Sequence, residues 1–193
     1  MSAGHEHPAT VSRRRANRGT ATRRALLVID MLNGFLDPRG ALYCGPAARR
    51  TIPFVARRIR AYARRGDAVL FSCDRHAPRD PEFRLWAAHC VRGTWEAEIA
   101  PGIPVPRGAR IIPKTTINPF HRTGLGRALA RARPEIVEVL GVCTNICVLY
   151  AAMELRVRSY RVRVPRRGVA TFDRRWHGLA LEAMARTFGV KVV

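Results

Sequence analysis

Three side chains that together can carry out acyl transfer stand at the ends of apolar runs in this chain of 193 residues. Asp30 closes the run ALLVID, Lys114 closes RIIPK, and Cys147 follows the run IVEVLGV within GVCTNIC. A carboxylate can take the proton of a thiol, an ammonium group favours the thiolate, and the thiolate attacks a carbonyl carbon. These residue types together indicate a cysteine nucleophile that forms a thioester.

Each of these residues also has an ordinary structural explanation. A cysteine is most often a small buried apolar residue, and an aspartate after a strand often caps a helix or forms a turn. Lys114 is harder to explain in this way, because it and Lys191 are the two lysines of a chain that otherwise uses arginine. At the start of a predicted helix, Cys147 is expected to have a lowered thiol pKa and to lie near free N–H donors.

A second group of polar residues follows the apolar run AVLFSC. Asp74 and His76 are two residues apart, so in an extended segment their side chains point to the same side. His89 can supply a further nitrogen. Carboxylate and imidazole ligands suit Zn²⁺, and also Mn²⁺ or Fe²⁺. The pattern predicts a divalent metal site, although an Asp-x-His pair alone is common in proteins without one.

Strand-length apolar runs alternate with segments of helical period, which indicates parallel β-α-β units. We therefore expect an α/β fold, a three-layer α/β/α domain with a mainly parallel sheet. Ligands in such folds bind beyond the carboxyl ends of the strands, where the polar residues above are placed. The predicted strands are 25–29, 68–72, 110–113, 136–141, 161–164 and 190–193. The predicted helices are 46–65, 125–133, 145–157 and 177–188.

Composition predicts one domain over residues 24–193, preceded by a disordered basic tail over residues 1–23 that has almost no large apolar side chains. The 35 basic and 14 acidic residues give a net charge of +21. Because the arginines are scattered through the chain, we expect no specific nucleic-acid partner. No apolar stretch can cross a membrane, and the five cysteines are an odd count without a secretory signal. These features predict a cytoplasmic protein with reduced thiols.

The chain resembles the nicotinamidase branch of the isochorismatase-like cysteine hydrolases over about residues 25–193. Four segments carry the resemblance, and their order and spacing match the family. They are ALLVIDMLNGF (25–35), the stretch from CDRH to GTWEAE (73–98), PKTTINPFHRTGL (113–125) and GVCTNICVLYAA (141–152).

The resemblance implies hydrolysis of nicotinamide to nicotinate and ammonia. Cys147 would be the nucleophile, Asp30 the general base and later acid, and Lys114 the group that stabilises the thiolate. The backbone N–H groups of Cys143 and Cys147 would form the oxyanion hole, with a cis peptide bond between Val142 and Cys143.

The resemblance also implies a metal site and a substrate pocket. Asp74, His76 and His89 match the family's ligands for one divalent ion, most often zinc, which holds the pyridine nitrogen. Glu82 matches a fourth ligand that some members have. Members are often homo-oligomers. The substrate pocket is expected to include three aromatic residues, namely Phe35, Trp86 and Phe120.

Two departures from the family pattern weaken the prediction of the substrate. Thr144-Asn145 stands where the family usually has Thr-Asp, and Asn118-Pro119-Phe120 stands where many members have Ser-Ala-Phe. A related hydrolase of another amide, such as a pyrazinamide-like or carbamoyl compound, is therefore an alternative. A basic nucleic-acid-associating protein on the same fold is a second alternative.

Overall fold

A parallel sheet of seven strands forms the centre of the computed structural model, which describes residues 22–193. The strand order is β3-β2-β1-β4-β5-β7, and β6 pairs with β4 beyond the end of β5. Every paired neighbour in the sheet is parallel, which confirms the predicted fold class. The strands are β1 (Arg24–Ile29), β2 (Ala68–Asp74), β3 (Arg110–Lys114), β4 (Ile136–Val142), β5 (Arg161–Val164), β6 (Val169–Ala170) and β7 (Lys191–Val192).

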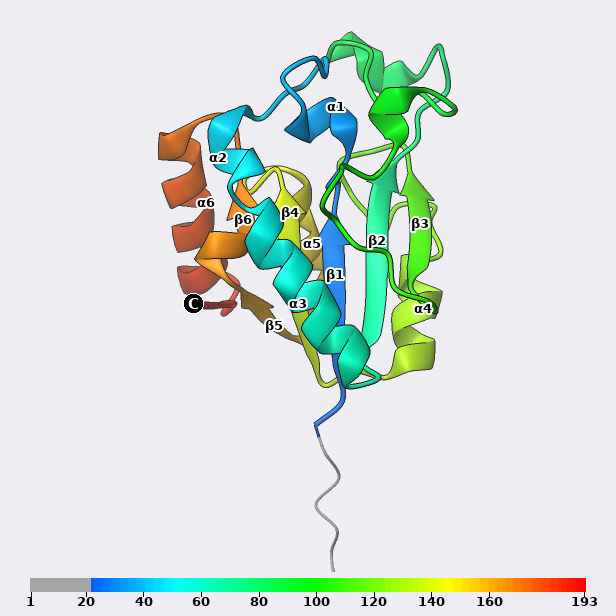
Figure 1. Ribbon diagram of the computed structural model, residues 1–193. Coiled ribbons are helices and arrows are strands. Elements are labelled where there is room, and N and C mark those ends of the chain that lie inside the picture. The colour runs from blue at the N-terminus through cyan, green and yellow to red at the C-terminus, as the bar shows by residue number, and fades with distance from the viewer. Residues whose placement is uncertain (1–21) are drawn as a thin grey trace, which may run out of the picture.

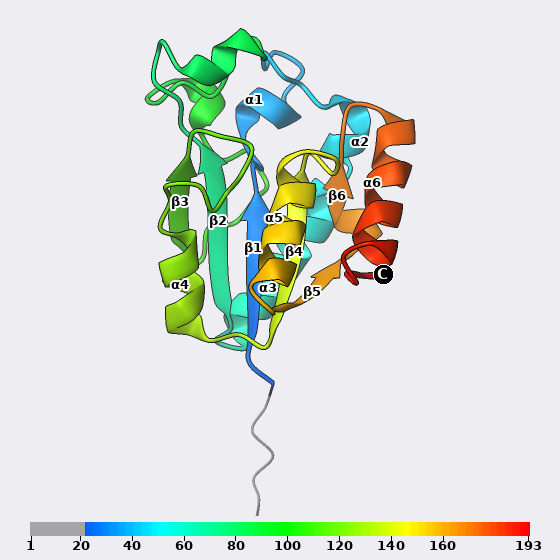
Figure 2. The ribbon, with the colours of Figure 1, turned by 180° about the vertical axis from the view of Figure 1, so that it is seen from behind.

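Helices cover both faces of this sheet (Figures 1 and 2). Figure 1 shows α3 in front of the central strands, and Figure 2, from behind, shows α4 and α5 on the other face. The α-helices are α1 (Asn33–Leu36), α2 (Gly45–Arg49), α3 (Ile52–Arg64), α4 (Leu125–Ala132), α5 (Cys147–Val157) and α6 (Arg174–Arg186). Short 3₁₀ turns are η1 (Pro81–Arg84), η2 (Trp95–Ala97) and η3 (Arg166–Gly168).

The alternation of side chains along β1 builds the two cores. Leu27 and Ile29 pack with α4, α5 and α6, whereas Leu26 and Val28 pack with α3 and the α1 segment. All four side chains are fully buried. Burial of a side chain of this size contributes about 1.5–3 kcal/mol. A strand that is apolar on both faces therefore anchors the middle of the sheet.

The predicted strands are all present, and β6 is an additional strand of two residues that is too short to show in the sequence pattern. The predicted helix 46–65 is wrong as one element, because it divides into α2 and α3 at Arg50 and Thr51. Pro53 lies in the first turn of α3. A proline has no N–H for a continuous helix, but it fits a new helix start.

Two helix starts also differ from the prediction. The helix α5 begins at Cys147 rather than Asn145, because Ile146 before it has a non-helical backbone with φ −122° and ψ −105°. The helix α6 begins earlier than expected, at Arg174. The Asp173 carboxylate accepts hydrogen bonds from the N–H groups of Arg175 and Trp176 at 2.6 and 3.1 Å, which caps this end.

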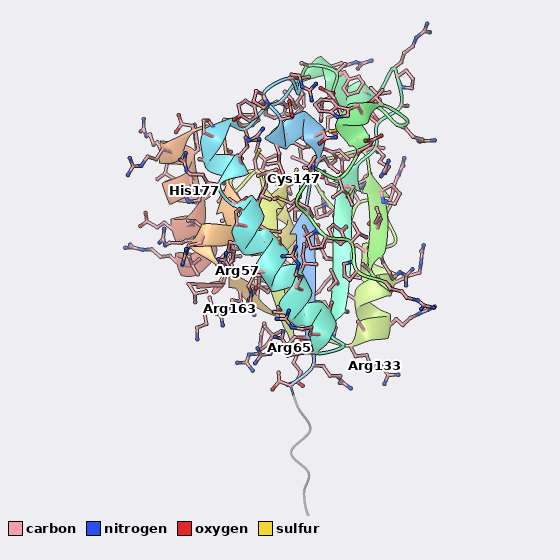
Figure 3. The ribbon with its side chains drawn as sticks, in the orientation of Figure 1. Arg57, Arg65, Arg133, Cys147, Arg163 and His177 are labelled. Atoms are coloured by element: carbon pink, nitrogen blue, oxygen red, sulfur yellow. The ribbon has the colours of Figure 1, made fainter. Side chains whose placement is uncertain are left out.

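The arginines come from many elements, as the labelled Arg57, Arg65, Arg133 and Arg163 illustrate (Figure 3). Residues 1–21 of the predicted basic tail lie outside the described residues. Arg23, the last residue of that tail, donates from Nε to the carbonyl oxygen of Arg133 at 2.9 Å. Within residues 22–193, no helix is long and apolar enough to span a membrane.

Gly141 lets the two central strands approach each other at the site edge of the sheet. It pairs with Ile29 and has a φ of +120°, which side chains rarely adopt. A Cβ atom added at Gly141 would lie 1.9 Å from the carbonyl oxygen of Ile29. Only glycine therefore fits at the strand end that leads to Cys143 and Cys147.

We predict that Gly141→Ala lowers the free energy of unfolding by about 3 kcal/mol or more, because the new methyl group collides with the backbone of β1. Urea unfolding followed by circular dichroism measures this change. Gly178→Ala is the matched control, since Gly178 is exposed in the interior of α6 with open space around it. That variant should gain about 0.5–1 kcal/mol. Equal stability of the two variants would contradict the close approach.

Candidate active site

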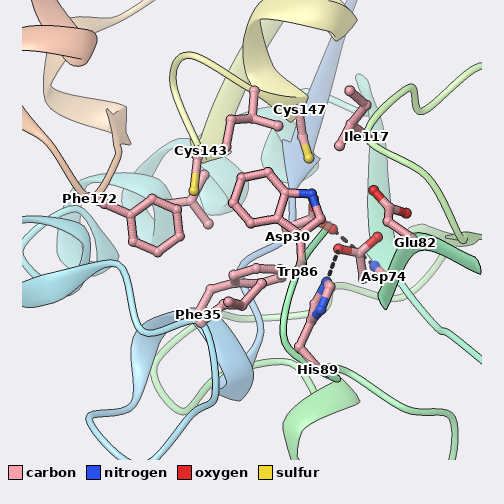
Figure 4. Close-up of a pocket in the computed structure, with 13 residues that line it drawn as sticks. Asp30, Phe35, Asp74, Glu82, Trp86, His89, Ile117, Cys143, Cys147 and Phe172 are labelled. Atoms are coloured by element: carbon pink, nitrogen blue, oxygen red, sulfur yellow. Dashed lines mark hydrogen bonds and ion pairs between the residues drawn. The ribbon is translucent and has the colours of Figure 1, made fainter. Parts of the chain in front are cut away.

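Four chain segments bring reactive side chains together at the carboxyl edge of the sheet. Asp30 follows β1, Asp74 and Lys114 are the last residues of β2 and β3, and Cys147 opens α5 after β4. These four strands are consecutive neighbours in the sheet, so their ends share one edge. Figure 4 shows Asp30, Asp74 and Cys147 around one pocket. The structure thus brings the predicted reactive residues together.

The ammonium group of Lys114 lies at the centre of this cluster. Its Nζ atom is 2.9 Å from Oδ2 of Asp30, 2.5 Å from Oδ1 of Asp74 and 3.6 Å from Sγ of Cys147. All four residues are buried. Burial opposes the charge of Lys114, but the two carboxylates outweigh burial and raise the pKa of its ammonium group well above the usual value. Lys114 is therefore a permanent positive charge.

Asp30 is held in a strained conformation that aims its carboxyl group into the cluster. Its φ is +49°, in the left-handed region, and its N–H donates to the carbonyl of Ser72 at 2.9 Å. Its Oδ1 atom accepts from the N–H of Asp74 at 3.0 Å. Burial and the charge of Asp74 raise the pKa of Asp30 to about 7, although Lys114 opposes this rise. A carboxyl group with this pKa can both accept and release a proton near neutrality.

The surroundings of Cys147 favour the neutral thiol over the thiolate. Burial raises its pKa well above the usual value, and the charge of Lys114 only partly opposes this effect. The lowered pKa expected from the helix start is therefore not observed, because desolvation is the larger effect. The ammonium group of Lys114 lies 3.6 Å from Sγ of Cys147 and 2.9 Å from Oδ2 of Asp30, so it links the thiol to the nearby base.

The turn before Cys147 leaves backbone donors free. The peptide bond between Val142 and Cys143 is cis, as predicted. Within residues 22–193, the N–H groups of Cys143 and Cys147 make no backbone hydrogen bond, whereas the N–H groups of Ile146 and Val148 both donate to the carbonyl of Cys143. Two free N–H groups next to a thiol are suited to hold a developing oxyanion.

The predicted metal ligands converge beside the catalytic cluster. Ligand atoms of Asp74, His76 and His89 all lie within 4.8 Å of one another, and all three residues are buried. Nε2 of His76 is 3.5 Å from Oδ1 of Asp74, and Nε2 of His89 is 3.6 Å from Oδ2. One carboxylate thus faces two imidazole nitrogens with one ion's space between them. This donor set suits a divalent metal.

The hydrogen bonds around these ligands fit a metal ion. Nδ1 of His89 is 2.8 Å from the carbonyl of Ala87, which leaves Nε2 free to face the cluster. Nε2 of His76 is buried without a hydrogen-bond partner, and so is Oε2 of Glu82. Buried nitrogen and oxygen atoms without partners are costly, and coordination would satisfy them.

Glu82 and Asp80 lie on the outer side of this cluster. Glu82 lines the pocket, but its carboxylate groups with His76 and Asp80 rather than with Asp74 and His89. Oδ2 of Asp80 is 3.2 Å from Nδ1 of His76, so this carboxylate lies beside the second nitrogen of that ring. Sequence reasoning missed Asp80, although a carboxylate four residues after a predicted ligand was a usable signal.

We predict that His89→Ala lowers the bound divalent metal at least about tenfold, because one of three converging ligands is removed. Metal content per chain, measured by mass spectrometry of the digested protein, checks this prediction. His121→Ala is the control, since His121 lines a separate cavity near β3. Unchanged metal content in His89→Ala would show that the ligands are assigned wrongly.

Apolar and aromatic residues wall the pocket above Cys147, including the predicted Phe35 and Trp86 (Figure 4). Phe35 is buried, and its ring lies 5.6 Å from that of His89. Sequence reasoning missed further lining residues, which come from four separate loops. These are Leu42, Ile117, Ile146 and Phe172.

The prediction that Phe120 lines the pocket needs correction, because Phe120 is not among the lining residues. Its ring packs against the core on the α5 side, and the guanidinium of Arg158 lies 4.3 Å from its centroid. Asn118 holds this turn, since its side chain donates to Glu154 at 2.7 Å and accepts from the N–H of Phe120 at 2.9 Å. Ile117 faces the pocket instead, so the Asn-Pro-Phe segment packs outward.

Two residues of the nucleophile turn are held by the segment around β6 and α6. Oγ1 of Thr144 is 2.9 Å from Nδ1 of His177, and Oγ1 of Thr171 donates to Oδ1 of Asn145 at 2.6 Å. Asn145, which replaces the family's aspartate, therefore accepts a hydrogen bond that positions the turn. Neither His177 nor Thr171 carried a sequence signal.

A family model described as the isochorismatase domain matches residues 24–192. The isochorismatase family protein PncA of Bacillus subtilis is 29% identical over 181 residues, which cover 88% of this chain and 98% of that relative. A crystal structure of nicotinamidase/pyrazinamidase PncA from Bacillus subtilis has a TM-score of 0.84 at 28% identity, covering 89% of this chain and 100% of that one.

Two further solved structures show different named activities on the same fold. The pyrazinamidase of Pyrococcus horikoshii in complex with zinc has a TM-score of 0.83 at 30% identity, covering 89% of this chain and 98% of that one. The N-carbamoylsarcosine amidase from Thermoplasma acidophilum has a TM-score of 0.80 at 30% identity, covering 89% and 95%. The fold alone therefore does not decide the substrate.

Proposed function

Because the chain belongs to the isochorismatase family, and because its pocket joins a buried cysteine to a cluster of metal ligands, we propose that it is a nicotinamidase. The reaction is hydrolysis of nicotinamide to nicotinate and ammonia through a thioester on Cys147, a step in the salvage of NAD. The observation that carries this proposal is that one pocket contains both a cysteine nucleophile and candidate metal ligands. A nucleophile is on one side, and Asp74 with His89 is on the other.

The geometry of the pocket supports a flat heteroaromatic amide as the substrate. Phe35 and Trp86 offer apolar faces to a ring, and Cys143 and Cys147 lie at the opposite wall. A site with few polar groups in an apolar slot fixes one orientation of its ligand. A pyridine ring with its nitrogen toward His89 would present its carboxamide to Cys147.

Asp74, His76 and His89 would hold the divalent metal. Glu82 would be a nearby outer carboxylate, since it lines the pocket and groups with His76. Zinc suits this set of imidazole and carboxylate ligands, and manganese or iron(II) can use the same donors. When bound, the ion supplies an open coordination position that can anchor the ring nitrogen of the substrate.

The residues of the chain perform the first half of the reaction. Asp30, with its raised pKa and its place in the same pocket as the thiol, removes the proton of Cys147 as the sulfur attacks the carboxamide carbon. The free N–H groups of Cys143 and Cys147 stabilise the oxyanion. Asp30 then gives its proton to the departing ammonia. Lys114 stays charged and compensates the negative charge that develops on sulfur.

The carboxylate of Asp30 also acts in the second half of the reaction, the hydrolysis of the thioester. Asp30 removes a proton from water, the hydroxide attacks the thioester carbon, and the bond to Cys147 breaks to release nicotinate. The thiolate regains its proton from Asp30. One group can act as base and acid in turn because burial keeps its pKa near 7.

We predict that Cys147→Ala lowers ammonia release from nicotinamide by roughly 10⁴-fold or more, because the variant lacks the proposed nucleophile. Ammonia is measured by a coupled assay on metal-loaded protein. Cys73→Ala is the matched control, since Cys73 is also a buried thiol but does not line the pocket. Turnover that survives in Cys147→Ala would exclude the mechanism.

The metal anchor predicts discrimination between two amides of nearly equal shape. Benzamide lacks only the ring nitrogen, so its kcat/KM should be at least about tenfold below that of nicotinamide. In the His89→Ala variant, which weakens the anchor, this ratio should fall toward one. Equal use of both amides by the native protein would contradict a role of the metal in holding the ring.

A carbamoyl-amide hydrolase is the second candidate, because the structure from Thermoplasma acidophilum named above is an N-carbamoylsarcosine amidase. Nicotinamide and N-carbamoylsarcosine are therefore compared in the same ammonia assay. Faster turnover of the carbamoyl compound would keep the cysteine chemistry and replace the substrate.

A further inference from the structure

A second cavity of ≈ 540 Å³ lies beside the active-site pocket. Residues of α2, β6 and the start of α6 line it, and Figure 1 shows these elements close together at one lateral edge of the sheet. The two cavities share Phe172 as a lining residue. Cys44 lines the second cavity and Cys143 lines the active-site pocket, and their Sγ atoms are in contact at 3.2 Å between the two cavities. The proposed catalytic residues do not line the second cavity.

The lining of this cavity is strongly and uniformly positive. Four arginines contribute to it, and none of its lining residues is an aspartate or glutamate. None of these arginines forms an ion pair within residues 22–193. The four are Arg50, Arg166, Arg167 and Arg174. Asp173, the adjacent acid, does not line the cavity, and it caps α6 instead.

The overall charge of +21 does not by itself explain this cavity. Other arginines pair with acids even where these are scarce, as Arg58 and Arg163 do with the buried Glu138 at 2.6 and 3.5 Å. Within residues 22–193, these four exposed guanidinium groups have no ion-pair partner, and together around one hollow they give a local positive potential that attracts anions.

His177 links this cavity to the nucleophile turn. It belongs to α6 (Figure 3) and lines the cavity, and its Nδ1 atom is 2.9 Å from Oγ1 of the buried Thr144. Burial and the charge of Arg166 lower the pKa of its imidazole, and both residues line the same cavity. Thr144 follows Cys143 in the chain. A group bound near Arg166 would therefore share a cavity with a ring that contacts the turn of the nucleophile.

We propose that this arginine-lined cavity is a binding site for a small phosphate-bearing anion. Guanidinium groups match phosphate oxygens with paired N–H donors, and several of them around one hollow favour a doubly charged group over chloride. The volume is that of a small-molecule site and exceeds what one phosphate needs. The ligand class is therefore a phosphate monoester or inorganic phosphate. The proposal does not depend on the substrate of the active site.

Calorimetric titration of the full-length protein tests this proposal. Inorganic phosphate and AMP are titrated separately at about 0.15 M salt, where exposed charges farther apart than about 8 Å are largely screened. We expect saturable binding of one anion per chain by at least one of the two. Tighter binding of AMP would identify a nucleotide-sized ligand, and tighter binding of phosphate would identify the bare group.

Two cavity variants and one control keep the test specific. Arg50→Ala and Arg166→Ala should each weaken binding roughly tenfold, because each removes charge-assisted hydrogen bonds to the anion. Arg131→Ala in α4 removes the same charge from an exposed residue outside the cavity and should leave the affinity unchanged. Absence of saturable binding, or an equal loss in Arg131→Ala, would overturn the proposal.

Discussion

The buried ammonium group of Lys114 is the interaction on which the rest of the site depends. Asp30 and Asp74 are neighbouring buried carboxylates, and the backbone N–H of Asp74 donates to Oδ1 of Asp30 at 3.0 Å. Without a cation between them, two such charges would repel each other strongly in a medium of low dielectric constant. Lys114 contacts both carboxylates and the thiol of Cys147, so one positive charge supports the nucleophile side and the metal side together.

The order of the strands makes this arrangement possible. Because β3, β2, β1 and β4 are neighbours, residues far apart in the chain reach the same edge through rigid strands rather than through long loops. Gly141 and the strained Asp30 both lie at this edge, where the sheet stops and the backbone must turn sharply. Strain of this kind is stable only because both strands are buried on both faces.

Sequence reasoning found the parallel sheet and the central residues because each has a local signature. Apolar runs of strand length end at Asp30 and Lys114, and another, IVEVLGV, precedes the segment that contains Cys147. The lining of the pocket, the contacts that support the nucleophile turn and the burial of the thiol have no such local signature. Ile117 rather than Phe120 faces the pocket because hydrogen bonds of Asn118 orient that turn, and the support of Thr144 by His177 joins segments 33 residues apart. The pKa of Cys147 depends on the extent of burial, which the helix start alone does not reveal.

The most direct test of the proposed chemistry is to trap the covalent intermediate. The metal-loaded protein is mixed with nicotinamide, quenched with acid during turnover, digested and analysed by mass spectrometry. The account predicts a nicotinoyl group on the peptide that contains Cys147, attached at that sulfur. Cys143 lines the same pocket and is the natural internal comparison. A nicotinoyl group on Cys143, or turnover with no acylated cysteine at all, would contradict the central role of Cys147.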